Sequence, residues 1–344
     1  MTAPPSMTRW GFDIPFDGIS LRDHQEIVAR AESLGYTDAW TGEVNGNDAF
    51  TPLAVAALSS QTLRLGVGIV SAFTRGPGLL AMTAASLAEL APGRVCLGIG
   101  AGSDIIVSGW NSIEFARPLE RVADVAAVVR AALRGEKVTD ARKTLTVHDF
   151  RLARPPAAPI PIFLAALRPR MLGLAGAVAD GVLLNWLSAE DIPRAVAEVE
   201  RGARESGRAD RVEIACRVFV CLARDDGAAE HVARRFVAAY QTVPVYRRFQ
   251  EWLGRGPQLA PMTEAWYAGQ RRQATELIPS DVLRDLVIFG PVDDCRTAIR
   301  RYRDAGVDTI VLHFLPAGDD ARDRGQLCVE ALSDFAPNTI VERP

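Results

Sequence analysis

An α/β fold, a closed (β/α)8 barrel, is predicted by three observations on this 344-residue sequence. Short apolar runs alternate with amphipathic helical segments along the chain, which is the pattern of successive βαβ units. The apolar runs are continuous, as expected for strands whose two faces are both covered. Eight such units fit a chain of this length, and eight parallel strands close into a barrel. A dinucleotide-binding open sheet is disfavoured, because no G-x-G-x-x-G follows the first strand.

The strands are placed where apolar residues run without interruption. They are expected at 9–14, 37–41, 63–70, 94–99, 161–165, 181–185, 212–222 and 308–314. Helices are expected at 21–34, 79–90, 118–133, 169–178, 189–203 and 293–304. A further helix is expected to follow the polar loop 43–48 and to end at residue 58. Ser20 is a candidate N-cap of the first helix and Gly35 its stop. Pro169 suits the first position of a helix, where its missing N–H costs nothing.

Two segments depart from this alternation. Residues 137–152 alternate polar and apolar side chains, which predicts a β-hairpin excursion. Residues 225–280, after the seventh strand, have a helical pattern and many aromatic side chains, which predicts a helical insertion. An insertion there lies at the catalytic face of a barrel, so its aromatic residues form either their own core or a wall of a substrate pocket. The whole chain, 1–344, is expected to be a single domain.

Composition narrows the functional classes. The chain has 39 basic and 42 acidic residues, and no basic block marks a nucleic-acid surface. Its five cysteines are scattered, without zinc-ligand spacing or a disulfide framework. No secretory signal and no membrane span are found. We therefore expect a cytoplasmic protein with a small-molecule partner, not a nucleic-acid or membrane partner.

The strand ends are poor in the residues of hydrolytic or metal sites. Only one histidine, His313, ends a strand, and a lone histidine in an apolar strand is more typical of a satisfied core residue than of a base. No carboxylate cluster has metal spacing, and no G-x-S-x-G elbow occurs. Glycine and other small residues follow the third, fourth and fifth strands instead, which suits a flat cofactor that carries the chemistry itself.

An ordered set of segments points to a family. The set comprises GVGIVSAFTRGP at 66–77, LAELAPGRVCLGIGAG at 87–102, AALRPRMLGLAG at 165–176, ADGVL at 179–183, and GPVDDC at 290–295 with AGVDT at 305–309. In this order they resemble the bacterial luciferase-like superfamily, and most closely its branch that uses coenzyme F420, a deazaflavin. The resemblance covers nearly the whole chain, although no single motif is decisive.

The resemblance implies where the cofactor lies. It implies a flavin or deazaflavin at the carboxyl ends of the strands, and a non-prolyl cis peptide at Gly68-Ile69 that forms a bulge behind the ring. The phosphate end of the cofactor would rest on the loop after the fifth strand and the helix start beyond it. The cofactor-binding residues implied are Glu43, Gly68, Ile69, Val70, Ser71, Gly100, Ala101, Gly102, Ala165, Ala166, Leu167 and Arg168. No metal is expected.

Two carboxylates are the candidate catalytic residues. Glu43 maps onto a family acid that contacts the ring, and Asp13 onto a glutamate of methylene-tetrahydromethanopterin reductases. Asp13 would act as an acid if burial raises its pKa; otherwise it is a carboxylate bonded to neighbouring loops. Some relatives place a histidine and a tryptophan beyond the second strand, where this chain has Val44 and Asp48. That departure puts sugar-phosphate dehydrogenation in doubt.

These implications give one leading function and two alternatives. The leading one is an F420-dependent oxidoreductase that transfers a hydride between the deazaflavin C5 and a small organic substrate. The first alternative is an FMN-dependent monooxygenase using reduced flavin and O₂. The second is a non-catalytic flavin- or deazaflavin-binding barrel. The resemblance also implies a homodimer.

Overall fold

The strand order confirms the closed barrel. The computed structural model describes residues 8–341. Eight parallel strands pair in the order β1–β10–β9–β8–β7–β4–β3–β2, and β1 also pairs with β2, which closes the ring. They are β1 (Arg9–Asp13), β2 (Asp38–Thr41), β3 (Arg64–Ser71), β4 (Val95–Gly100), β7 (Ile162–Ala165), β8 (Gly181–Leu184), β9 (Glu213–Leu222) and β10 (Thr309–Pro316). Each lies within about two residues of its predicted range.

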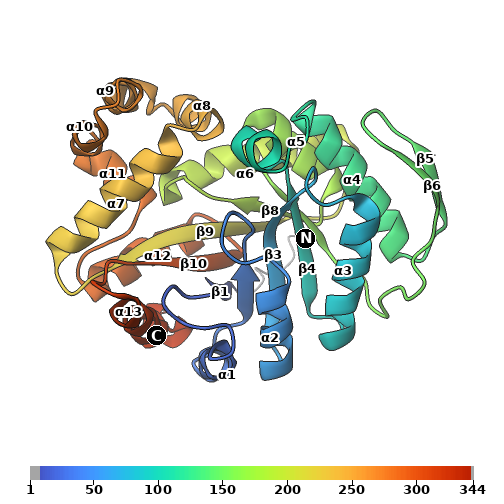
Figure 1. Ribbon diagram of the computed structural model, residues 1–344, viewed down its shortest axis with the longest axis horizontal. Coiled ribbons are helices and arrows are strands. Elements are labelled where there is room, and N and C mark those ends of the chain that lie inside the picture. Colours follow the sequence, from blue (N-terminus) through green and yellow to red (C-terminus); the bar gives the residue numbers. More distant parts are fainter. Residues whose placement is uncertain (1–7, 342–344) are drawn as a thin grey trace.

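Helices connect successive strands around the outside of the barrel (Figure 1). They are α1 (His24–Ser33), α2 (Thr51–Ser59), α3 (Pro77–Leu90), α4 (Pro118–Leu133), α5 (Pro169–Val178), α6 (Ile192–Glu205) and α12 (Val292–Asp304). Both α4 and α5 have the predicted bounds, because a proline starts each of them. Helix α6 begins three residues later than predicted, because Ser188 and Asp191 cap each other around a short 3₁₀ turn.

The two predicted excursions are confirmed, and the second is longer than expected. Strands β5 (Val138–Ala141) and β6 (Thr146–Phe150) form the hairpin. The insertion consists of α7 (Asp226–Gln241), α8 (Pro244–Leu253), α9 (Gly256–Tyr267), α10 (Arg271–Glu276) and α11 (Ser280–Leu286). Figure 1 shows it at the opposite side of the molecule from the hairpin. Three helices are missing from the sequence prediction: a π-helical turn (Ile105–Trp110), α13 (Ala321–Asp334) and α14 (Pro337–Ile340).

Inward-facing side chains fill the middle of the barrel with an apolar layer, because successive residues of a strand point to opposite faces. The layer consists of Trp40, Cys96, Phe163, Leu183, Ala215 and Val311. The rings of Trp40 and Phe163 meet edge to face with centroids 5.7 Å apart. Gly66 and Gly181 make room for them, since a Cβ at either position would lie 2.2 Å from a ring atom.

A charged layer closes the amino-terminal end of the barrel. Arg64 donates two hydrogen bonds to Glu213, at 2.9 and 2.7 Å, and its Nε donates to Asp38 at 2.5 Å. Arg9 also donates to Asp38, and Thr309 donates to Glu213. These residues are at the first positions of five strands, so one network joins the starts of β1, β2, β3, β9 and β10.

Replacing Arg64 tests this network. Arg64→Met would leave the fully buried Asp38 and the partly buried Glu213 without their shared cation. Breaking a buried ion pair from one side costs about 3–5 kcal/mol, so we expect a loss of that size in the free energy of unfolding, measured by urea denaturation. The control is Arg272→Met, which removes an exposed pair with Glu276 and should cost less than about 1 kcal/mol. Equal effects of the two substitutions would contradict the role of the network.

Candidate active site

The predicted site residues lie at one end of the barrel, because the carboxyl ends of parallel strands meet at one face. They are on, or directly after, β1, β2, β3, β4 and β7: Asp13, Glu43, Gly68–Ser71, Gly100–Gly102 and Ala165–Arg168. The structure brings Asp13 close to the Gly68 carbonyl through a residue that the sequence prediction omits, Arg217 of β9. Whether these residues contact a cofactor stays a prediction.

Arg217 is the inward-facing cation of this end. Its Nη2 donates to the Gly68 carbonyl at 2.6 Å, to Asp13 Oδ1 at 3.0 Å and to the Thr41 carbonyl at 3.3 Å. Its Nε lies 2.5 Å from Asp13 Oδ2, in an ion pair that lacks hydrogen-bond geometry. One guanidinium therefore joins the ends of β1, β2 and β3 to β9.

Asp13 is buried and accepts from two partners. Besides Arg217, the Nδ1 of His313 lies 2.8 Å from Asp13 Oδ2. Burial by itself would raise the pKa of Asp13, but the positive charge of Arg217 and the hydrogen bond from His313 outweigh it, so the pKa lies below its ordinary value. The condition for Asp13 to act as an acid, a raised pKa, is therefore not met, and of the two expected roles the bonded carboxylate fits: Asp13 is an anion at neutral pH.

Glu43 is held by a second arginine that the sequence prediction omits. The Nε of Arg75 is 3.1 Å from both oxygens of Glu43, and its Nη2 donates to Oε2 at 2.6 Å. The backbone N–H of Ala49 donates to the same oxygen at 3.3 Å. The hydrogen bonds with Glu43 raise the pKa of Arg75. The Glu43 side chain is partly exposed. Its position is therefore fixed by Arg75, while part of the carboxylate stays accessible.

The bulge at the end of β3 is present. The Gly68-Ile69 peptide is cis, as the resemblance implies. Val67 and Val70 pair with Leu97 and Ile99, which leaves Gly68 and Ile69 outside the regular register. Ile69 packs against the apolar layer of the barrel.

The loop after β4 supports this bulge. A Cβ on Gly100 would lie 2.8 Å from Ile69 Cδ1, so this glycine makes room for the bulge. Ser71 Oγ donates to the Ala101 carbonyl at 2.9 Å, and it also accepts the Phe73 N–H. The glycine and the hydroxyl therefore fix the shape of this end of the barrel.

The loop after β7 presents an unpaired cation at a helix start. Arg168 is the N-cap of α5 and has an extended backbone. Its side chain is exposed, and within residues 8–341 it forms no hydrogen bond or ion pair. The first N–H groups of a helix lack intrahelical acceptors and favour anions. Residues 166–168 therefore fit an anionic group.

Aromatic side chains of the insertion pack on the barrel. Trp186 follows β8, and its ring centroid lies 4.5 Å from that of Phe219, 5.0 Å from Phe236 and 4.8 Å from Tyr240. Tyr246 also contacts Trp186. We call these five residues the aromatic cluster. Phe249 and Trp252, by contrast, stack on each other within α8, as expected of aromatic residues that form the insertion's own core. That the aromatic cluster walls a substrate pocket stays a prediction.

A buried arginine fixes the insertion to the barrel. Arg255, between α8 and α9, lies 2.8 Å from both Asp191 and Asp285. It also contacts Gln250, whose amide donates to the Trp186 carbonyl at 2.7 Å. The chain of contacts runs from the insertion to the loop after β8, and so places the insertion's part of the aromatic cluster.

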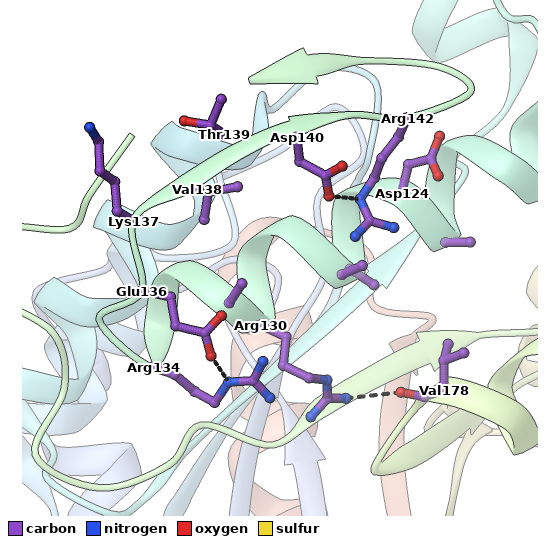
Figure 2. Close-up of a pocket in the computed structure, with 14 residues that line it drawn as sticks. Asp124, Arg130, Arg134, Glu136, Lys137, Val138, Thr139, Asp140, Arg142 and Val178 are labelled. Atoms are coloured by element: carbon purple, nitrogen blue, oxygen red, sulfur yellow. Dashed lines mark hydrogen bonds and ion pairs between the residues drawn. The ribbon is translucent and has the colours of Figure 1, made fainter. Parts of the chain in front are cut away.

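A separate groove lies away from these residues. The groove, of about 590 Å³, lies between α4 and the hairpin (Figure 2), and none of the predicted site residues lines it. Its charged residues pair with one another or with neighbours, as in Arg134–Glu136 and Arg142–Asp140. Across the described chain, no group of three or more metal-ligating side chains occurs and no helix is long and apolar enough to cross a bilayer.

The sequence holds a signal for one of the two omitted arginines. Arg217 interrupts the apolar run IACRVFVC, two residues from Ala215 and four from Glu213, so it shares their inward face. A charged residue on the buried face of a central strand needs a partner. Arg75 lies in the quoted segment at 66–77, but nothing local in the sequence pairs it with Glu43.

The lowered pKa of Asp13 gives a pH-dependent prediction. A lowered folded-state pKa means stabilisation that is complete above the unfolded value of about 3.9 and is lost as the pH falls through the folded value. We expect Asp13→Asn to lower the free energy of unfolding by about 3 kcal/mol at pH 7. The difference in unfolding free energy between the wild type and this variant should become smaller below about pH 4. Urea denaturation from pH 7 to pH 3 measures it, with the exposed Asp210→Asn as control. A difference in unfolding free energy that does not change with pH would contradict the lowered pKa of Asp13.

Comparison with known proteins identifies the family. Residues 6–309 match the family model described as luciferase-like monooxygenase. A protein of Mycobacterium tuberculosis whose name describes a coenzyme F420-dependent oxidoreductase is 30% identical over 337 residues, 88% of this chain and 92% of that protein. A 5,10-methylenetetrahydromethanopterin reductase of Methanolobus tindarius is 31% identical, covering 82% of this chain and 86% of the reductase.

A solved structure shares the fold. The coenzyme F420 dependent tetrahydromethanopterin reductase from Methanopyrus kandleri superimposes with a TM-score of 0.80 and 23% identity, covering 97% of this chain and 99% of that one. The barrel, the bulge of β3 and the family match agree with the resemblance of the sequence. The chain belongs to the luciferase-like monooxygenase family.

Proposed function

We propose that this chain is a coenzyme F420-dependent oxidoreductase that transfers a hydride between the deazaflavin C5 and a small organic substrate. The similarity to relatives named for F420 supports the cofactor. The observation that carries the proposal in this chain is the exposed, unpaired Arg168 at the start of α5, on the same barrel face as the bulge at Gly68 and Ile69. A flat ring with an anionic tail fits this combination.

Each part of the site has a separate task in this proposal. Residues 166–168 would bind the anionic tail, and residues 68–71 and 100–102 would lie beside the ring. Glu43, fixed by Arg75, would contact the ring and orient it. When bound, the cofactor supplies two-electron hydride chemistry and does not activate oxygen. Asp13 is an anion held by Arg217, so it would position a proton-transferring group and would not donate the proton itself.

The alternative is an FMN-dependent monooxygenase, which the description of the family itself favours. Both cofactors have a flat tricyclic ring and a phosphorylated tail, so the barrel geometry accommodates either. The choice therefore rests on measured cofactor preference.

Side-by-side titration of the purified apoprotein with F420 and with FMN, read by cofactor fluorescence, tests the proposal. We expect micromolar binding of F420, with FMN weaker by at least about tenfold, or roughly 1.4 kcal/mol. Arg168→Gln should weaken F420 binding about tenfold, with the effect shrinking at high salt, while the exposed Arg272→Gln should not. The reverse preference would replace the proposal by the monooxygenase, and binding of neither cofactor would refute both.

We also propose a cytoplasmic homodimer. The five cysteines are buried thiols that form no disulfide within the described residues, as expected in a reducing compartment. Helices α2 and α3 carry large exposed apolar side chains, namely Leu58, Leu79, Met82 and Leu90. Their exposed fractions are 44–69%, and large exposed apolar side chains on neighbouring helices are typical of an interface. A two-fold contact with a second copy is the commonest way to cover such a surface.

Charge placed on this surface should separate the dimer. We expect light scattering to give twice the chain mass for the wild type, and a single chain mass for the double variant Leu79→Glu, Met82→Glu. The control is Ile105→Glu, which changes an equally exposed apolar residue outside α2 and α3. A monomeric wild type at micromolar concentration would contradict the dimer.

A further inference from the structure

His313 has one nitrogen bonded and one open. Its Nδ1 contacts Asp13 Oδ2 at 2.8 Å. Its side chain is 36% exposed, and Nε2 has no hydrogen bond within residues 8–341 and is not among the buried unpaired atoms. The open nitrogen therefore faces accessible space at the carboxyl end of β10.

His24 shows what a structural histidine looks like in the same chain. It is 1% exposed, its Nε2 accepts the Phe16 N–H at 2.7 Å, and its Nδ1 lies 2.7 Å from the Ser20 carbonyl. Both nitrogens are used, and burial lowers the pKa of His24. His313 is partly exposed and has one nitrogen without a hydrogen bond in the described residues, so the expectation that it is a satisfied core residue is wrong.

The carboxylate of Asp13 fixes the imidazole. Because the carboxylate is an anion that only accepts, the hydrogen on His313 is placed on Nδ1, and Nε2 is left for another partner. Arg217 keeps Asp13 charged and in place from the other side. This order of a fixed carboxylate, an imidazole and an open nitrogen is how enzymes orient a histidine for proton transfer.

The surroundings of His313 are aromatic. The ring of Phe219 meets the imidazole edge to face at 5.4 Å, and Phe236 of the insertion lies parallel to it at 6.5 Å. The titratable or charged groups near His313 include Asp13 and Arg217. Tyr240 contacts Phe236, and Tyr246 contacts Tyr240. Burial raises the pKa of Tyr240, and raises that of Tyr246 to about 12, so both phenols stay neutral at pH 7. Apolar walls around one proton-exchanging nitrogen favour a substrate with a single polar atom.

We propose that His313 Nε2 exchanges a proton with the oxygen of a carbonyl or alcohol substrate that has an apolar substituent, and that Asp13 is its positioning residue. This inference rests on the proposed function. In the reducing direction the reduced cofactor would supply a hydride to the carbonyl carbon, and the C=O π bond breaks as the new C–H bond forms. The oxygen takes a proton from Nε2, which is protonated by water before this step. The imidazole then regains a proton from water. The reverse steps oxidise the alcohol.

The kinetic test uses reduced F420 with three ketones: acetone, cyclohexanone and acetophenone. We expect the wild type to consume at least one of them. His313→Gln should lower kcat by about 10²–10⁴-fold and leave the F420 dissociation constant within about threefold. Added imidazole should raise the turnover rate of His313→Ala at least tenfold. Asp13→Asn should lower kcat about tenfold or more with little change in KM, and Asp13→Glu should recover part of it. His148→Gln, at an exposed histidine, is the control.

A second readout does not depend on turnover. Diethyl pyrocarbonate modifies accessible neutral imidazoles, and peptide mass mapping distinguishes the four histidines. We expect modification of His313 but not of His24 in the folded protein. Saturating oxidised F420 should slow the modification of His313 at least fivefold and leave that of His148 unchanged.

The outcomes separate this inference from the proposed function. If F420 does not bind the wild type, the proposed function fails. If F420 binds but no ketone is consumed, or His313→Gln keeps its kcat within threefold, or His313 resists the reagent, only the role of His313 is overturned. Matching unfolding midpoints for His313→Gln and the wild type exclude misfolding, and imidazole rescue of His313→Ala gives a check that a merely structural histidine would fail.

Discussion

The guanidinium of Arg217 holds the carboxyl-terminal end of the barrel in its observed shape. It bonds to the carboxylate that ends β1, to the last carbonyl of β2 and to the carbonyl of the bulge in β3. Without it, Asp13 would be a buried charge that has lost its permanently charged partner, which is far more costly than a lost surface pair. The position of His313 follows from that carboxylate, so the arrangement of four strand ends depends on one side chain.

The barrel interior is an apolar layer between two charged ones. In the layer at the amino-terminal end, the central Arg64 is bonded to Asp38 and to both oxygens of Glu213. The layer at the other end, centred on Arg217, is paired on its inner side and leaves Nε2 of His313 open. Buried charge of the same kind therefore has a structural role at one end and a chemical role at the other.

The sequence allowed the barrel to be predicted because continuous apolar runs and helix stops are local signals. It did not allow the partners of Asp13 to be predicted, because residue 13 meets residues 217 and 313 only once the ring closes through β10 and β9. The pairing of Glu43 with Arg75 likewise depends on adjacent strand ends. Helix α13 had a local signal, since Asp320 caps it, but it follows the eighth strand, where the barrel pattern was already complete.

Because Arg255 fixes the insertion to the barrel, the sequences of the insertion and of the barrel can change at different rates in evolution. The insertion supplies Phe236, Tyr240 and Tyr246, while Asp13, Arg217 and His313 all belong to barrel strands. Mutations in α7–α11 can therefore change the insertion's part of the aromatic cluster without disturbing the charged layer centred on Arg217. This holds as long as Arg255 keeps its contacts with Asp191 and Asp285. In an evolutionary or engineering sense the insertion is an exchangeable module, and libraries confined to it would vary the shape of the site on an unaltered scaffold.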